Sequence, residues 1–166
     1  GWFGEQNPFE FRLDYRASHD MRKFLTGSQP VLSMTSIVNG LELILRAGIE
    51  PLRKKSVQQT EYLIFLAKEW LFSLGYSLGS PEDPEKRGSH VSLQHKEAYR
   101  ICKALTDPDG SGPPVIPDFR EPDNIRLGIA PLYTSYEDIY MAMSKLRSIV
   151  QDRLFLDYSN ERQGVT

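Results

Sequence analysis

Val115-Ile116-Pro117-Asp118-Phe119-Arg120-Glu121-Pro122-Asp123-Asn124-Ile125-Arg126-Leu127-Gly128-Ile129 is the stretch that most directly indicates the fold of this chain. Residues 115–120 and 124–129 flank Glu121-Pro122-Asp123, a tight-turn sequence with proline in its second position. The stretch therefore predicts a β-hairpin that forms part of a small sheet.

Working outward from the hairpin, apolar spacing and turn residues predict the remaining elements. Thr134 or Ser135 should start the last helix, with Glu137 and Asp138 in its first turn. The predicted elements in chain order are helix 30–47, helix 50–75, a loop at 80–88, strand 90–95, helix 96–105, a turn at 107–114, the hairpin and helix 136–150. This order predicts an α+β fold with a small, mostly antiparallel sheet packed against helices.

The composition excludes several classes of protein. The 166 residues carry 20 Lys and Arg against 22 Asp and Glu, so the chain lacks the basic surface that nucleic-acid binding requires. No apolar run has the length of a membrane span, and the single cysteine, Cys102, excludes an internal disulfide framework and is typical of a reducing cytoplasm. The chain opens on Gly1 without an initiator methionine, so we expect a piece of a longer protein.

The residue types that carry catalysis or bind metals form no familiar motif here. His19, His90 and His95 lack cysteine or acidic partners at ligand spacing, so we expect surface or strand-end histidines and no metal site. The sequence has no Gly-x-Ser-x-Gly motif and no phosphate-binding Walker loop. Cys102 falls on the apolar side of its helix, where core packing is expected. Arg53-Lys54-Lys55 should form an exposed basic patch.

Arg126 and Trp2 have more distinctive binding chemistry. Arg126 alternates with Ile125 and Leu127, so its side chain should leave the apolar face of the strand. There Arg126 is either solvated or binds a carboxylate through two parallel hydrogen bonds of its guanidinium group. The indole N–H of Trp2 can donate one hydrogen bond. The residues alone favour a solvated arginine and an aromatic side chain packed on other protein.

A set of short motifs in chain order resembles consecutive stretches of the kynureninases. The set covers nearly the whole chain except residues 73–85 and the tail, and consists of Gly1-Trp2-Phe3-Gly4, Phe24-Leu25-Thr26-Gly27-Ser28-Gln29-Pro30, Leu52-Arg53-Lys54-Lys55-Ser56, Arg87-Gly88-Ser89-His90-Val91-Ser92, Ile116-Pro117-Asp118-Phe119-Arg120-Glu121-Pro122-Asp123, Ile125-Arg126-Leu127-Gly128 and Pro131-Leu132-Tyr133. The resemblance implies the C-terminal portion, somewhat under half, of such an enzyme.

Kynureninases are homodimeric, cytoplasmic hydrolases that use pyridoxal 5'-phosphate and have the aspartate-aminotransferase fold, fold type I. The resemblance implies hydrolysis of L-kynurenine, or of 3-hydroxykynurenine, to release L-alanine in tryptophan catabolism, the kynurenine pathway that leads to NAD biosynthesis. It also implies that residues 1–30 are an ordered loop segment from the end of the large cofactor-binding domain. Residues 31–156 would then be the C-terminal small domain, including an interdomain helix 31–47, and 157–166 a tail.

By position, the resemblance implies roles for three residues. Trp2 would donate its indole N–H to the cofactor phosphate, and Ser28 would touch the same phosphate, often across the dimer interface. Arg126 would pair with the substrate α-carboxylate. No catalytic residue is expected in this chain because the Schiff-base lysine would precede Gly1, so the fragment alone would be inactive. Two features concern the substrate: Glu5 stands where the family usually has histidine, and Gly27-Ser28 resembles the bacterial pair that favours kynurenine itself.

Two alternatives remain open from the sequence. One is another fold-type-I enzyme, such as a cysteine-desulfurase-like lyase, in which Arg126 would still hold a carboxylate. The other is a non-catalytic interaction or small-ligand regulatory domain built from the same sheet and helices. For this second alternative, replacing Arg126 would not change the turnover of the parent protein.

Overall fold

The computed structural model describes residues 1–107 and 112–161 of the chain. Residues 108–111 of the predicted turn and 162–166 of the predicted tail lie outside the described residues. The chain forms two compact units, Gly1–Arg46 and Ala47–Thr166, and each is considered by itself.

The first unit consists of short turns of helix followed by one long helix. Three 3-10 helices, η1 (Trp2–Gly4), η2 (Pro8–Glu10) and η3 (Met21–Phe24), are joined by loops and by an isolated bridge between Glu5 and Ala17. The helix α1 (Val31–Ala47) follows, close to its predicted bounds, although none of its residues is buried. The Asp20 side chain caps η3 by accepting from the Arg22 backbone N–H. Hydrogen bonds from Arg22 hold the pKa of Asp20 well below its ordinary value.

The second unit begins with α2 (Ile49–Trp70), which is shorter than the predicted helix 50–75. A 3-10 turn, η4 (Phe72–Leu74), follows, and Gly75 adopts a φ of 94°, a left-handed conformation that glycine favours. The remaining elements are β1 (Ser77–Leu78), η5 (Pro84–Lys86), β2 (His90–Gln94), α3 (Ala98–Thr106), β3 (Asp118–Arg120), β4 (Asn124–Gly128), α4 (Tyr136–Gln151) and η6 (Leu154–Asp157). Of these, strand β1 was missed because it has only two residues.

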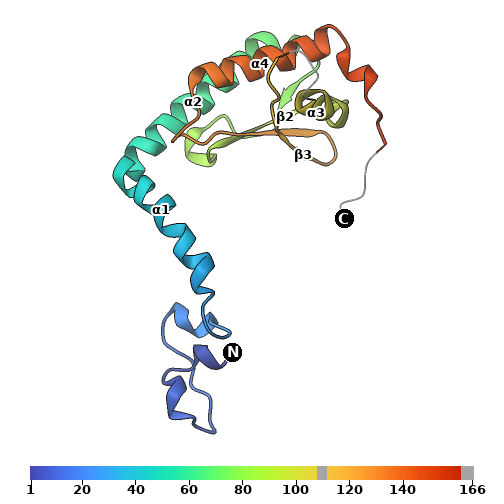
Figure 1. Cartoon of the computed structure of the whole chain (residues 1–166). Coiled ribbons are helices and arrows are strands. Elements are labelled where there is room, and N and C mark those ends of the chain that lie inside the picture. The colour runs from blue at the N-terminus through green and yellow to red at the C-terminus, as the bar shows by residue number, and fades with distance from the viewer. Residues whose placement is uncertain (108–111, 162–166) are drawn as a thin grey trace. The chain divides into compact units, whose positions relative to one another are not determined.

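The four strands form one antiparallel sheet in the order β1-β2-β4-β3 (Figure 1). The predicted hairpin is confirmed, with Phe119 opposite Ile125 and Arg120 opposite Asn124 around a turn whose Glu121–Pro122 peptide bond is cis. The prediction of an α+β fold with a small antiparallel sheet packed against helices is therefore correct.

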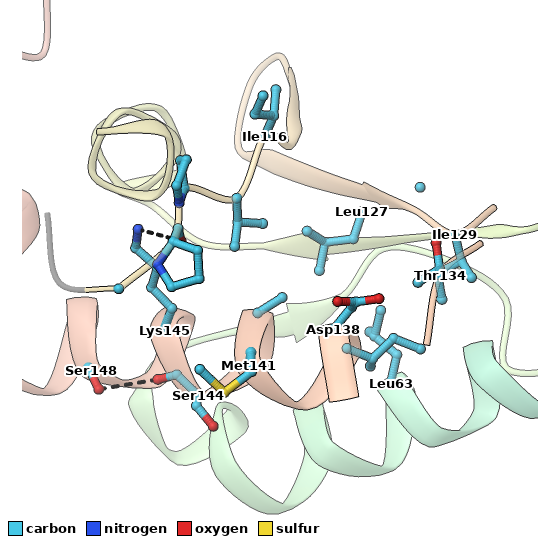
Figure 2. Close-up of a pocket in the computed structure, with 17 residues that line it drawn as sticks. Leu63, Ile116, Leu127, Ile129, Thr134, Asp138, Met141, Ser144, Lys145 and Ser148 are labelled. Atoms are coloured by element: carbon cyan, nitrogen blue, oxygen red, sulfur yellow. Dashed lines mark hydrogen bonds between the residues drawn. The ribbon is translucent and has the colours of Figure 1, made fainter. Parts of the chain in front are cut away.

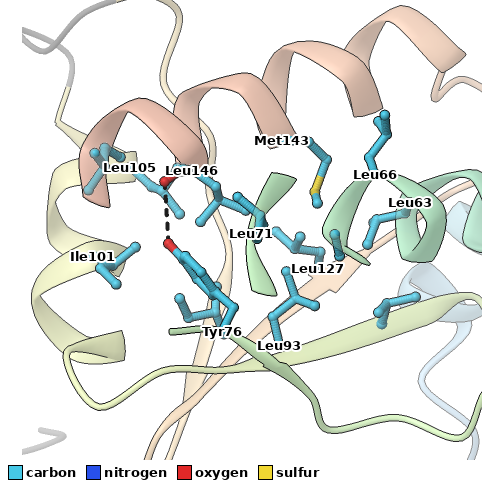
Figure 3. Close-up of a cluster of buried hydrophobic side chains, with 14 of the residues drawn as sticks. Leu63, Leu66, Leu71, Tyr76, Leu93, Ile101, Leu105, Leu127, Met143 and Leu146 are labelled. Carbon is cyan, nitrogen blue, oxygen red and sulfur yellow. Dashed lines mark hydrogen bonds between the residues drawn. The ribbon is translucent and has the colours of Figure 1, made fainter. Parts of the chain in front are cut away.

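One face of this sheet is buried under helices. Val91, Leu93 and Ile125 are fully buried, and they meet residues such as Leu71 and Leu146 from the helical layer (Figure 3). Burying a side chain of this size contributes about 1.5–3 kcal/mol, which makes this apolar layer the main source of stability. Phe65 on α2 is 57% exposed, while its neighbours Ile64 and Leu66 are buried in the core.

Candidate functional site

The sheet face opposite the helices is polar. Because side chains alternate along a strand, the buried residues Val91, Leu93, Ile125 and Leu127 leave their neighbours on the other face. Ser92, Asn124 and Arg126 lie there, all partly exposed, and the Ser92 hydroxyl donates to Asn124 Oδ1 at 2.9 Å. The predicted direction of Arg126, away from the apolar face, is confirmed.

Arg126 stands in the middle of one cross-strand row on this polar face. Its register partner on β2 is Ser92, and its partner on β3 is Asp118, whose Oδ2 accepts a hydrogen bond from Arg126 Nη2. The Arg126 side chain is still 37% exposed. Two residues further along the same face comes Gly128, where a Cβ would meet no atom within 4 Å. A guanidinium beside open space can receive a planar anion such as a carboxylate.

In the first unit, two segments 19 to 25 residues apart in the sequence approach each other at glycines. A Cβ on Gly1 would lie 2.0 Å from the Thr26 carbonyl oxygen, and one on Gly4 would lie 2.5 Å from the Lys23 oxygen. Any side chain at these two positions would therefore clash with backbone. The close approach brings Trp2 to Gly27, since a Cβ on Gly27 would lie 3.8 Å from Trp2 Nε1.

Trp2 and Ser28 offer hydrogen-bond donors at this junction. Trp2 is 49% exposed, and its ring packs edge-on against Phe3 with centroids 4.8 Å apart. Within the described residues, neither the Trp2 indole N–H nor the Ser28 hydroxyl has a hydrogen-bond partner. Gly27 places no side chain between them. This set of unsatisfied donors fits a phosphate group, which accepts several hydrogen bonds.

The chain is similar in sequence to a known family of proteins. The family model described as the kynureninase C-terminal domain matches residues 52–146. Proteins named kynureninase from Geobacillus thermodenitrificans, Bacillus cereus and Shouchella clausii are 38%, 36% and 33% identical to the chain, each over 99% of its length.

The chain belongs to the kynureninase family. It spans 38% of the length of each of these relatives. The domain that the family model matches has the α+β architecture described above, and it belongs to the fold-type-I enzymes that use pyridoxal phosphate.

The three residues singled out by the kynureninase resemblance thus fall into two groups. Trp2 and Ser28 are both in the first unit, where the fold brings their segments together. Arg126 is in the second unit. Glu5, at the position where the family usually has histidine, is half-buried, and its Oε2 accepts from the Asn7 backbone N–H at 2.5 Å.

Sequence reasoning missed a set of α2 side chains that fix the loops flanking β2 and β4. Arg53 and Lys55, predicted to be exposed, are half-buried and donate to the carbonyls of Pro84 and Pro131. Buried Gln59 donates to the Thr134 carbonyl at 2.7 Å. The signal was present in the motif Leu52–Ser56, but the carbonyl partners lie more than 30 residues away in the sequence.

Cys102 and His95 of the second unit are buried in the core, whereas His90, the first residue of β2, is exposed as expected. Cys102 is 8% exposed, and burial raises the pKa of its thiol to about 12, which confirms the prediction of core packing. His95 comes directly after β2, as a strand-end histidine, but it is buried and not at the surface. Its Nδ1 accepts from the Glu97 backbone N–H at 3.0 Å.

A pocket of about 500 Å³ lies between α4, β4 and residues 112–116 (Figure 2). Its walls are mostly apolar, and the buried Lys145 ammonium at one end donates to the Pro113 carbonyl at 3.1 Å. Arg126 does not line this pocket, although Leu127 and Gly128, which follow it on β4, do.

Metal-binding clusters and membrane-spanning helices can be assessed over residues 1–107 and 112–161. No group of three or more His, Cys, Asp or Glu side chains in this part of the chain could hold a metal ion. No single helix there is long and apolar enough to cross a membrane, and only α1 and α2 taken together, as a broken pair, reach that length and composition.

Proposed function

We propose that this chain is the C-terminal part of a pyridoxal-phosphate-dependent kynureninase, which hydrolyses L-kynurenine to anthranilate and L-alanine. The observation that carries the proposal is Arg126: in a chain related to kynureninases over 99% of its length, it lies on the open sheet face beside free space. We place the enzyme in the cytoplasm as a homodimer in the kynurenine pathway, which leads to NAD biosynthesis. The fragment alone is inactive because it lacks the Schiff-base lysine.

The residues of this chain bind and orient the cofactor and the substrate. Trp2 donates its indole N–H, and Ser28 its hydroxyl, to the phosphate of the cofactor. Arg126 pairs with the α-carboxylate of the substrate in two places and so fixes the direction of the bond from Cα to its proton. When bound, pyridoxal phosphate supplies the electron sink that such carbon–carbon hydrolysis needs. Ser28 favours kynurenine over 3-hydroxykynurenine.

The test uses the full-length enzyme with pyridoxal phosphate and L-kynurenine, followed by anthranilate fluorescence. Arg126→Ala removes two charge-assisted hydrogen bonds, so kcat/KM should fall on the order of 100-fold or more. Arg126→Lys should also be impaired because an ammonium cannot bind a carboxylate in the same two-pronged way. Arg147→Lys, an equivalent change at an exposed position on α4, serves as the control.

Each other outcome has a distinct meaning. An absorbance band of bound cofactor without anthranilate release would support a fold-type-I enzyme that acts on another substrate, such as a cysteine-desulfurase-like lyase. If neither the cofactor absorbance band nor anthranilate is observed, and an Arg126 variant behaves like wild type, the non-catalytic interaction or small-ligand regulatory domain is the remaining alternative.

A further inference from the structure

Asp118 connects two arginines on the polar face of the sheet. Its Oδ2 accepts from Arg126 Nη2 across the β3–β4 pair and also from Arg120 Nε at 3.0 Å on its own strand. One carboxylate oxygen thus joins two guanidinium groups, and all three side chains remain partly exposed.

The Arg126 guanidinium has no other anchor among the described residues. Ser92, its register partner on β2, directs its hydroxyl to Asn124 Oδ1, and Gly128 has no side chain. A free arginine side chain samples many rotamers, and restricting them on ligand binding costs affinity. Asp118 holds the guanidinium at Nη2 before any ligand arrives.

The charge balance decides whether this arrangement suits an anion. Asp118 and Arg126 alone would form a neutral pair, and the Asp118 carboxylate would repel an incoming carboxylate. Arg120, bound to the same Oδ2, adds a second positive charge. The three side chains together carry a net charge of +1, so the cluster attracts an anion while Arg126 stays fixed.

We propose that Asp118 is a positioning residue for the substrate carboxylate: it orients Arg126, and Arg120 offsets its negative charge. This inference rests on the proposed function, and it adds two residues to the carboxylate site. Asp118 itself touches neither substrate nor cofactor.

The test is Asp118→Asn in the full-length enzyme loaded with pyridoxal phosphate. We expect KM for L-kynurenine to rise about tenfold, with kcat within about threefold of wild type, because the loss of Arg126 preorganisation outweighs the loss of the Asp118 negative charge, which Arg120 already offsets. In equilibrium binding by calorimetry, L-alanine, the product that keeps the α-carboxylate and is not hydrolysed, should bind about tenfold more weakly, while its decarboxylated amine, ethylamine, should bind with unchanged affinity. Asp123→Asn makes the same charge change in the turn of the same hairpin and should leave both ligands unaffected.

Two results would overturn the proposal: an unchanged or lower KM in Asp118→Asn, or an equal loss of affinity for the amino acid and the decarboxylated amine. If Asp118→Asn does not fold, Arg120→Gln tests the proposal instead, because it leaves Asp118 in place. An unchanged KM for L-kynurenine in Arg120→Gln would also overturn the proposal. The binding comparison needs no turnover. If the wild-type enzyme released no anthranilate, the proposed function would therefore be wrong. The ratio of the two affinities would still test the positioning role of Asp118.

Discussion

At the scale of single residues, Arg126 leaves the apolar face of β4 because its neighbours Ile125 and Leu127 are both buried. Period-2 alternation was enough to predict that direction from the sequence. The ion pair with Asp118 was not predictable, because it depends on the register between β3 and β4. A slip of one residue would have placed Asp118 on the buried face.

Trp2 provides the first test at this scale. Trp2→Phe keeps a ring that can pack against Phe3 and Phe9 but removes the indole N–H. We expect the affinity of the full-length enzyme for pyridoxal phosphate to fall at least about tenfold, because one hydrogen bond to a charged group is lost. Titration of the cofactor absorbance band measures this.

Trp70→Phe is the matched control for Trp2→Phe, since Trp70 packs on Tyr140 in the other unit and has no proposed contact with the cofactor. An unchanged cofactor affinity in Trp2→Phe would remove Trp2 from the phosphate site. Ser28 would then be the remaining residue of this chain implicated there.

At the scale of elements, α4 begins where its capping residues predicted. Ser135 is the N-cap and accepts from the Asp138 backbone N–H at 3.0 Å, while the Asp138 carboxylate accepts in return from the Ser135 backbone N–H at 2.7 Å. Hydrogen bonds to the Asp138 carboxylate from the Ser135 backbone N–H, above all, and from the Ser135 hydroxyl lower the pKa of Asp138. Two of the free N–H groups at the helix start are satisfied in this way.

Ser135→Ala should lower the free energy of unfolding by about 1 kcal/mol, because the side-chain acceptor at the helix start is lost. Urea denaturation followed by circular dichroism measures the change. Ser148→Ala, in the interior of the same helix, removes only a hydroxyl that donates to the Ser144 carbonyl, and should change stability by less than about 0.5 kcal/mol. Equal losses in the two variants would contradict a capping role for Ser135.

The end of α2 shows the limit of element prediction. Apolar residues continue past Trp70, so periodicity predicted one helix to Gly75. The chain instead turns so that Leu71 and Tyr76 enter the core, and the Tyr76 hydroxyl donates to the Leu146 carbonyl on α4. Packing against a helix 70 residues away decided where α2 stops.

At the scale of the whole second unit, His95 is buried by segments from distant parts of the chain. Its ring lies 4.7 Å from the Tyr76 ring and 6.4 Å from Phe155. Burial lowers the pKa of His95 below its ordinary value of 6.5; the Leu74 carbonyl and Glu97 oppose this shift, and Lys96 adds to it.

This burial makes stability depend on pH in a defined direction. Above pH 6.5 the histidine is neutral in both the folded and unfolded chains, so it adds no pH dependence. As the pH falls below 6.5, the unfolded chain binds a proton that folded His95 resists, so the free energy of unfolding decreases until the lowered pKa is reached. Denaturation at pH 7.5 and pH 5.5 should show this decrease, and His95→Gln should reduce it.

His19→Gln, at an exposed position of the first unit, is the control and should leave the decrease unchanged. The same pH dependence in His95→Gln as in wild type would show that His95 does not contribute. The sequence placed His95 at a strand end but could not show its burial, because Tyr76 and Phe155 reach it only in the folded chain.

The sequence by itself determined the local features of this protein: the hairpin, the alternation that turns Arg126 outward, the cap of α4, and the ordered motifs that mark a kynureninase. The hairpin, the alternation, the cap and each single motif depend on residues within a few positions of one another. Only the tertiary structure decided that Asp118 and Arg120 share one carboxylate oxygen beside Arg126, and that Trp2 meets Gly27. The same holds for Arg53 and Lys55, which bind distant carbonyls. These contacts depend on strand register and chain packing, which local preferences do not specify.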